Sequence, residues 1–271
     1  PRSTLFPYTT LFRSKEEIRE IVPPALAQGR EFKLDACGLQ CPGPILKLYN
    51  KMGEVEEGDI VTVTATDFGF TNDVAAWADK TGNKLLSIGQ EGTTIVARVQ
   101  KGLTEKVEAA GTAPVLRDKT IVVFSGELDK ALAAFIIATG AAAMGRKVTM
   151  FFTFWGLNIL RKENAPAVKK TLMEKLFGWM MPKGADRLKL SQLHMAGLGT
   201  GMIKSVMQQK NIASLPVMIE AARKNGVRLL ACQMSMDMMG IRREELLDGV
   251  EIAGVATFIA ASDDANATLF I

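Results

Sequence analysis

The sequence contains few of the residues that build cross-linked or metal-binding scaffolds. It has three cysteines and one histidine among 271 residues. Three cysteines are too few for a disulfide framework and are typical of a reducing compartment, where thiols do chemistry. We therefore expect a cytoplasmic protein. His194 has no companion at metal-ligand spacing, so we interpret it as a polar loop residue.

The sequence also lacks a long apolar run and a basic block. The longest apolar run, residues 131–144, is about one third shorter than a bilayer span requires, and it contains Thr139 and Gly140. We expect a buried helix there and no integral membrane segment. Lys and Arg outnumber Asp and Glu by 33 to 29. Because this excess is spread along the chain, the composition argues against a nucleic-acid partner.

The first residues do not resemble part of a fold. The segment TLFPYTTLFRS at 4–14 resembles a translated reading frame of a short-read sequencing adaptor and lacks the features of a secretory signal. We exclude residues 1–14 from the fold, and the alternative is an extension with no fold of its own. Residues 15–30 contain a Pro-Pro break and are interpreted as a linker remnant. If this interpretation holds, further domains precede Lys15 in the intact protein.

The remaining chain divides into two α/β domains, which agrees with its length. Residues 31–102 are predicted to form a small two-layer βαβαββ unit. Residues 103–118 lack apolar periodicity and hold a glycine and a proline, so we predict a linker. From residue 119 a buried strand and a long helix open a doubly wound, mostly parallel α/β sheet that extends to residue 271.

Three further elements of the second domain follow from its pattern. A Met-rich insertion occupies residues 158–210. Near the end we predict a strand over 254–260 and a last helix from Asp263. Within the insertion, apolar residues between 172 and 180 share one helical face. We expect a neighbouring subunit or the core of its own domain to cover this face, with a membrane surface as the alternative because Trp179 lies at its end.

Cys41 lies in a turn that favours thiol chemistry. The turn Cys41-Pro42-Gly43-Pro44 follows a predicted strand and opens a predicted helix. Because proline is favoured at the first helical position, Cys41 is predicted to be the N-cap. The helix dipole and free N–H groups lower a cysteine pKa there, and Lys47 and Lys51 add positive charge. We therefore expect a reactive thiolate, and the alternative is an inert core cysteine.

This part of the chain resembles a known family. The segment LDACGLQCPGP at 34–44, followed by Gly58-Asp59 and Thr66-Asp67, is similar to the TusA (SirA-like) sulfur-carrier family, and the resemblance covers roughly residues 31–102. In that family the cysteine of the Cys-Pro-x-Pro turn carries a persulfide, which implies this role for Cys41. The motif does not require Cys37. We interpret Cys37 as filler, and the alternative is a thiol that resolves a Cys41 persulfide as a disulfide.

The third cysteine, Cys232, ends an apolar strand predicted at 227–232. Ligand sites in open α/β sheets lie at the carboxyl ends of strands, so we expect chemistry here, with an inert core cysteine as the alternative. Four methionines follow between residues 234 and 239. Their thioethers suit a polarizable sulfur or an adaptable partner, but such runs also form ordinary core. Asp237 could position a proton donor, although we favour capping of the next helix.

Residues 119–271 resemble the DsrE/DsrF/DsrH-like family of sulfur-relay proteins through FFTFWGL at 151–157, MPKG at 181–184 and CQMSMDMMG at 232–240. The family's active cysteine maps onto Cys232. The two domains together resemble the C-terminal part of larger flavin- and pyridine-nucleotide-dependent (coenzyme A) disulfide reductases that carry a rhodanese module. Since no Gly-x-Gly-x-x-Gly follows a strand, neither FAD nor NAD can be assigned to the residues present, and we expect no cofactor.

Together these features predict a sulfur relay, a sulfurtransferase reaction in which sulfane sulfur passes between Cys41 and Cys232 as a persulfide. A flexible linker of about 15 residues spans on the order of 20 Å, which gives a millimolar-range effective concentration. We expect persulfide donor and acceptor proteins, such as rhodanese-like carriers, as partners, and a homo-oligomer formed through the second domain. The alternatives are a non-catalytic binding or assembly module with a Met-rich partner surface, a Cu(I) chaperone, and an accessory part of a disulfide reductase.

Overall fold

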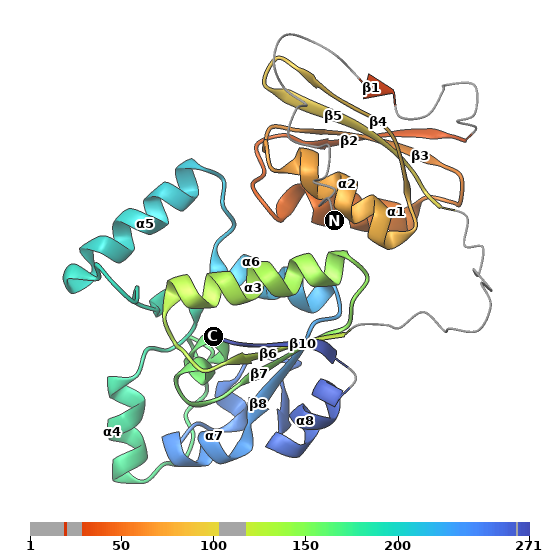
Figure 1. The fold of residues 1–271 in the computed structure, drawn as a ribbon. Helices are drawn as coiled ribbons and strands as arrows, with labels where there is room; N and C mark the ends of the chain where they lie inside the picture. The colour runs from red at the N-terminus through yellow and green to blue at the C-terminus, as the bar shows by residue number, and fades with distance from the viewer. Residues whose placement is uncertain (1–18, 21–28, 103–117, 264) are drawn as a thin grey trace, which may run out of the picture.

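The computed structural model describes residues 19–20, 29–102, 118–263 and 265–271, and it shows two α/β domains stacked through a layer of helices (Figure 1). The predictions for residues 1–14 and for the linker over 103–117 lie outside the described residues. Within residues 15–30, which we interpret as a linker remnant, the structure shows the short strand β1 (Arg19–Glu20), which pairs antiparallel with a strand of the first domain.

The first domain has the predicted βαβαββ order. Its sheet runs β1-β4-β5-β3-β2, in which β2 and β3 are parallel and the other pairs antiparallel. The elements are β2 (Glu31–Ala36), α1 (Gly43–Glu54), β3 (Ile60–Ala65), α2 (Phe70–Thr81), β4 (Lys84–Glu91) and β5 (Thr94–Gln100).

Strand periodicity explains the two layers of this domain. In β5 alternate residues are buried, namely Ile95, Ala97 and Val99, because successive side chains of a strand point to opposite faces. Both helices cover this buried face, and each contributes residues at helical spacing, such as Leu48 on α1 and Val74 on α2. The core therefore lies between the sheet and the helices.

The second domain is a doubly wound sheet, as predicted. Its strands are all parallel and run in the order β10-β6-β7-β8-β9, with α3 and α6 on one face and α8 on the other (Figure 1). The elements are β6 (Asp118–Val123), α3 (Leu128–Ala143), β7 (Val148–Phe152), α6 (Leu215–Lys224), β8 (Arg228–Cys232), α7 (Gln233–Met239), β9 (Glu251–Ala253), α8 (Val255–Asp263) and β10 (Ala265–Phe270).

The two elements predicted at the end of this domain are wrong. Residues 255–260 of the apolar run belong to helix α8, and the segment after Asp263 contains strand β10. The run was open to either assignment, because a short apolar stretch does not distinguish a strand from a helix. The sheet edge beyond β8 is occupied by the short strand β9, and α8 crosses the sheet to bring β10 beside β6.

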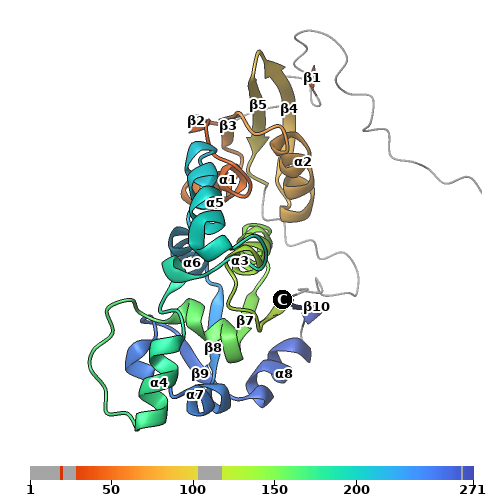
Figure 2. The ribbon, with the colours of Figure 1, turned by 90° about the vertical axis from the view of Figure 1, so that its left-hand side faces the viewer.

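The Met-rich insertion forms α4 (Leu172–Met180), α5 (Leu198–Gln209) and short 3₁₀ turns, and both helices project from the body of the domain (Figures 1 and 2). Helix α4 begins with a capping box between Thr171 and Glu174. The prediction that its own domain covers the apolar face is wrong, because Leu172 is 84% and Met180 68% exposed. Within the described ranges, none of the helices combines the length and the apolar content needed to cross a bilayer.

A buried ionic cluster holds the start of the insertion to the end of the domain. The Glu245 carboxylate lies 3.3 Å from Arg161 Nη2 and 2.6 Å from Lys170 Nζ, and all three side chains are almost fully buried. The same carboxylate accepts the backbone N–H of Arg242 at 2.9 Å. These contacts compensate a charge that would otherwise be costly to bury.

The two domains meet through helices. Figure 1 shows α1 and α2 of the first domain facing α3 of the second. Ala143, at the end of α3, is fully buried within the core cluster of the first domain. The Trp77 indole Nε1–H donates to the Ala143 carbonyl at 2.5 Å. The first domain thus lies on the α3/α6 side of the second sheet.

Candidate functional site

Two loops that follow the parallel strands β2 and β3 hold Cys41. The N–H of Gly38 donates to Thr66 Oγ1 at 2.8 Å, and the N–H of Cys41 donates to Asp67 Oδ2 at 2.9 Å. Because β2 and β3 are neighbours, the loops after them lie side by side at one end of the sheet. The predicted residue Asp67 therefore fixes the loop that carries the thiol.

Cys41 is not the N-cap of α1. The helix begins at Gly43, its N-cap is Pro42, and Pro44 lies in the first turn. The Cys41–Pro42 peptide is cis. Cys41 thus precedes the cap, one residue further from the helix than predicted, and the contribution of the helix dipole falls off over this range.

The two lysines of α1 bind other groups, and neither is among the groups that shift the pKa of the Cys41 thiol. Lys47 Nζ donates to the Asp35 carbonyl at 2.9 Å. Lys51 Nζ lies 2.9 Å from Glu54 Oε2 and 5.4 Å from the centre of the Phe32 ring. The prediction that these lysines add positive charge beside Cys41 is therefore not met.

The surroundings of Cys41 raise the thiol pKa instead of lowering it. The cysteine is exposed at its outer surface, but neighbouring side chains partly enclose it. This desolvation raises the pKa of the Cys41 thiol, and the carboxylates of Asp73 and then Asp67 raise it further. The prediction of a lowered pKa is wrong. Sequence reasoning missed Asp73, although its place in the first turn of α2, after the loop of Asp67, was a usable signal.

Cys37 lies on the same loop and is exposed. Its N–H donates to Asp35 Oδ1 at 2.9 Å, and burial together with Asp35 raises the pKa of its thiol. Thr64 acts in the lowering direction but is outweighed, so the described neighbours of Cys37 do not lower the pKa of its thiol overall. The interpretation of Cys37 as filler stays a prediction, which the substitution described below tests.

Cys232 lies at the carboxyl end of β8, where chemistry was expected, but its side chain is buried and only 5% exposed. It packs with Phe151, Leu230 and Phe258 in a small cluster. Leu229 and Ala231 belong instead to the core beneath α3 and α6. Since side chains of a strand alternate, Cys232 points to the opposite face, which α8 covers.

Helix α7 begins directly after Cys232 and divides the methionine run. Met236 and Met239 pack into the main core, whereas Met234 and Met238 are exposed. The four thioethers therefore do not form one cluster. Asp237 lies inside α7, where it accepts Gln233 Nε2–H at 2.9 Å, so the capping role favoured for it is wrong.

The structure does not bring Cys41 and Cys232 together. The first domain packs against α3, on one side of the second sheet, through Trp77 and Ala143. The Cys232 side chain faces α8, on the other side. The sheet and the α3/α6 layer therefore separate the two thiols in this arrangement.

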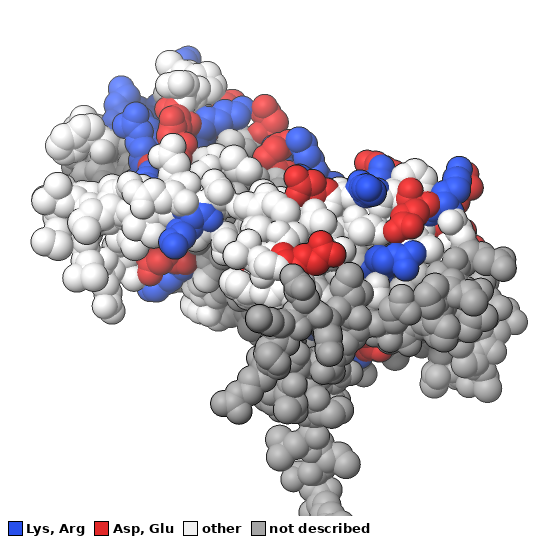
Figure 3. All heavy atoms as spheres, turned by 90° about the horizontal axis from the view of Figure 1, so that it is seen from above, with Lys and Arg blue, Asp and Glu red and all other residues white. Residues whose placement is uncertain are grey.

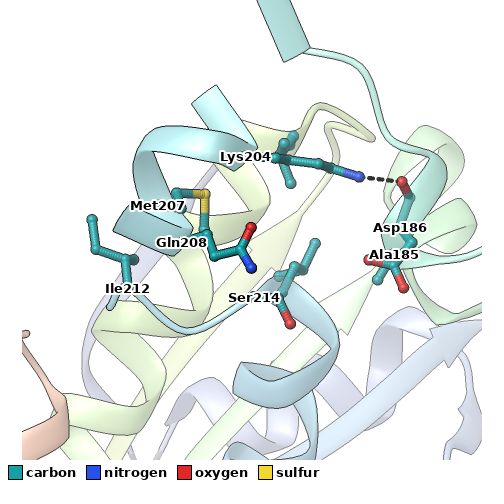
Figure 4. Close-up of a pocket in the computed structure, with 9 residues that line it drawn as sticks. Ala185, Asp186, Lys204, Met207, Gln208, Ile212 and Ser214 are labelled. Atoms are coloured by element: carbon teal, nitrogen blue, oxygen red, sulfur yellow. Dashed lines mark hydrogen bonds between the residues drawn. The ribbon is translucent and has the colours of Figure 1, made fainter. Parts of the chain in front are cut away.

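Among the described residues, two cavities of ligand size have linings without a cysteine. One, of about 360 Å³, lies between α5 and α6, where Lys204 Nζ donates to the Asp186 carbonyl at 2.5 Å (Figure 4). The other, of about 420 Å³, is lined by the loops after β6 and β7. His194 Nδ1 lies 3.0 Å from Thr200 Oγ1. In the part of the chain that the structure describes, no group of His, Cys, Asp and Glu side chains could hold a metal ion.

Comparison with known families agrees with this two-domain architecture. The chain belongs to the DsrE/DsrF/DrsH-like family, whose profile matches residues 117–270. The profile of sulfurtransferase TusA matches residues 32–101. Both domain resemblances predicted from the sequence are confirmed.

Three relatives each match one of the two domains. Uncharacterized protein YrkE of Bacillus subtilis is 53% identical over 152 residues, which cover 56% of this chain and 95% of YrkE. Sulfur carrier protein DsrE2 of Allochromatium vinosum is 37% identical over 155 residues, which cover 56% of this chain and 96% of DsrE2. Putative sulfur carrier protein YrkI of B. subtilis is 45% identical over 69 residues, which cover 26% of this chain and 92% of YrkI.

Proposed function

We propose that this protein is a sulfur carrier that relays sulfane sulfur as a persulfide, with Cys41 as the entry thiol and Cys232 as the second. The observation that carries the proposal is the position of Cys41. It is exposed in a turn that two neighbouring loops hold through backbone hydrogen bonds, in a domain that matches sulfurtransferase TusA. Relatives of both domains are named sulfur carriers, which supports a role in sulfur relay.

Cys41 acts through accessibility and not through a lowered pKa. Its thiol is exposed, whereas Cys232 is 5% exposed. The thiolate is the attacking species in persulfide exchange, so loading of Cys41 should speed up as the pH rises. A donor protein that removes a proton or brings a cation on docking would have the same effect.

Hand-over to Cys232 requires a change in the arrangement of the domains. Either the first domain leaves α3 and reaches the face covered by α8, or the sulfur passes to Cys232 of another copy. Both routes require movement of α8, because Phe258 packs over Cys232. The relay therefore requires the contact through Trp77 and Ala143 to open reversibly, as interfaces between domains of one chain often do.

Loading with a low-molecular-weight persulfide, followed by mass spectrometry of the cysteine peptides, tests the relay. In the wild type one added sulfur atom should appear first on Cys41 and later on Cys232. Cys41→Ser should leave Cys232 unloaded, and Cys232→Ser should leave Cys41 loaded and slow to unload. Cys37→Ser is the matched control, because it removes an exposed thiol of the same loop, and it should change neither result.

Two outcomes would contradict the proposal in different ways. If Cys232 loads equally well in the Cys41→Ser protein, each domain carries sulfur independently and there is no relay. If neither cysteine takes up sulfur, the protein is not a carrier, and the alternative of a binding or assembly module gains support.

The exposed apolar residues of the insertion favour a binding role beside the relay. Helix α5 carries Leu198, Met202 and Val206 exposed by 71%, 69% and 47%, and the end of the molecule that it forms is largely free of charge (Figure 3). Such surfaces mark interaction sites. We propose that a second copy covers α4 and α5. Light scattering should show an oligomer, and Met202→Glu with Leu176→Glu should convert it to a monomer; a monomeric wild type would contradict this.

An accessory role in a larger disulfide reductase remains a prediction. Its test is the genomic DNA that precedes the codon for Lys15. A dinucleotide-binding domain there would support it, and another type of domain would contradict it.

A further inference from the structure

The acidic side chains beside Cys41 lead to an inference that rests on the proposed relay and specifies its acceptor. Asp67 Oδ2 accepts the N–H of Cys41 at 2.9 Å, and Asp67 Oδ1 accepts the N–H of Gly69 at 3.0 Å. A methyl group added to Gly69 would lie 3.3 Å from Asp67 Oδ1 and 3.9 Å from Asp73 Oδ2. The two carboxylates therefore converge on the turn next to the thiol.

Among the residues that the structure describes, no lysine or arginine lowers the pKa of the Cys41 thiol and so offsets these carboxylates. On α1, Lys47 and Lys51 are bound to the Asp35 carbonyl and to Glu54. From the second domain, the uncharged amide of Asn211 lies next to this loop, near Gly38. Among the described residues, the charges that shift the pKa of the Cys41 thiol are those of Asp73 and Asp67, and both add to the larger effect of desolvation.

We propose that Asp67 and Asp73 form an electrostatic gate that slows the release of sulfur from Cys41 and opens for an acceptor that presents lysine or arginine side chains beside its thiol.

The chemistry of release explains why negative charge acts as a gate. The acceptor thiolate attacks the terminal sulfur of Cys41–S–SH, and a new S–S bond forms while the old one breaks. Cys41 leaves as a thiolate and then takes up a proton, so the acceptor becomes the persulfide and no oxidant or reductant is consumed. The charge that develops on the Cys41 sulfur faces two carboxylates, and exchange slows as the leaving thiol becomes more basic. A cation placed beside the carboxylates reverses this effect.

Asp67 and Asp73 contribute differently. Asp67 accepts two backbone N–H groups and so positions the loop. The Asp73 carboxylate accepts no hydrogen bond from any described residue, and its side chain is half-buried. Burial and then Asp67 raise the pKa of the Asp73 carboxyl, so Asp73 loses its charge more readily than an ordinary aspartate. Of the two carboxylates, Asp73 is therefore the one whose charge responds to a change in pH or to a nearby cation. Its substitution removes a charge without removing a hydrogen bond.

The charges of the two domains fit this proposal. Residues 31–102 contain 7 Lys and Arg against 10 Asp and Glu, a formal charge of −3. Residues 119–271 contain 19 Lys and Arg against 13 Asp and Glu, a formal charge of +6. An acceptor with the charge of the second domain is the kind of partner that the gate favours, whereas small anionic thiols should react more slowly.

The test uses the full chain with Cys37→Ser and Cys232→Ser, so that Cys41 is the remaining thiol. Loaded Cys41 is unloaded by cationic cysteamine, neutral 2-mercaptoethanol or anionic 3-mercaptopropionate, compared at equal thiolate concentration. The rate should fall in that order. Asp73→Asn should accelerate the neutral and anionic acceptors by roughly threefold to tenfold and reduce the preference for cysteamine. Asp73→Glu should behave like the wild type, and so should Asp79→Asn, an exposed carboxylate on the same helix.

Equal rates for the three thiols in the wild type would overturn the gate, as would an equal effect of Asp73→Asn and Asp79→Asn. If Cys41 takes up no sulfur, the relay fails and the gate is judged from alkylation of the free thiol. In the Asp73→Asn variant the alkylation rate of Cys41 should then begin to rise at a lower pH than in the wild type. At neutral pH a tenfold larger thiolate fraction corresponds to about threefold faster alkylation, because nucleophilicity falls as the thiol becomes more acidic. An unchanged pH profile would overturn the gate independently of the relay.

Discussion

Phe258→Ala should expose Cys232 without unfolding the second domain. Phe258 is the one buried residue among the described side chains of α8. It stacks on Phe151 with ring centroids 5.1 Å apart, and both rings pack with Cys232. Truncating the ring removes the main apolar anchor of α8 and leaves the hydrogen bond from Ser262 to Thr120. The helix should then separate from the sheet more often.

The size of the effect follows from the packing lost. Truncation of a core phenylalanine costs about 3–5 kcal/mol. Phe258 is 8% exposed and belongs to a small cluster, so we take about 2 kcal/mol for the local opening of α8. At 1.36 kcal/mol for each factor of ten, the open population rises about 30-fold. Alkylation of Cys232 occurs from the open form, so its rate should rise by about the same factor.

Timed alkylation with iodoacetamide, resolved by mass spectrometry, measures Cys232 and Cys41 in the same sample. Cys41 is an internal reference, since its rate should not change. Ile259→Ala is the matched control, because this neighbour on α8 is 52% exposed. The reasoning is refuted if Phe258→Ala leaves the Cys232 rate unchanged, or if Ile259→Ala raises it equally.

The remaining predictions concern stability. Glu245→Ala should lower the free energy of unfolding by about 3–5 kcal/mol in denaturant titrations, because it leaves Arg161 and Lys170 buried without their carboxylate. Trp77→Phe should cost about 0.5–1.5 kcal/mol by the same measurement, because the Ala143 carbonyl loses its indole donor. Hydrogen bonds from Arg30 lower the pKa of Asp59, so its contribution is present above the unfolded pKa of about 3.9 and is lost as the pH falls through the folded value. In the Asp59→Asn variant the free energy of unfolding should therefore fall less steeply as the pH is lowered. Deleting residues 1–14 should leave Tm within error, and a drop of several degrees would show that they belong to the fold.

The fold could be predicted where a stretch of sequence has a clear hydrophobic pattern of sufficient length. The alternation in β5 and the long apolar helix α3 identify their elements without tertiary information. The run over 254–260 could not be assigned in this way. Its type depends on the long-range pairing of β10 with β6, which forces α8 to cross the sheet.

The position of the candidate site could be predicted from the sequence, but the charges that act on the Cys41 thiol could not. The Cys-Pro turn fixes the loop of Cys41, whereas the charge near its sulfur comes from Asp67, on a loop 26 residues away, and from Asp73, in the first turn of α2. The direction of Lys47 depends on the Asp35 carbonyl, a backbone partner that local spacing does not reveal.

The side of the sheet to which Cys232 points could not be predicted from the sequence, for a different reason. Both faces of β8 are buried, so hydrophobicity does not show which residues point toward which helix layer. Placing Cys232 beneath α8 required knowing that α8 exists.

The hydrogen bond between Trp77 and Ala143 also has a spectroscopic consequence. Trp77 is 2% exposed, whereas Trp155 is 51% and Trp179 80% exposed, and these are the three tryptophans of the chain. Collisional quenchers should reach Trp155 and Trp179 at once and Trp77 only when the indole is uncovered. In a Trp155→Phe, Trp179→Phe background, the emission of Trp77 would therefore follow the separation of the domains in real time, during loading and unloading of sulfur, without an added label.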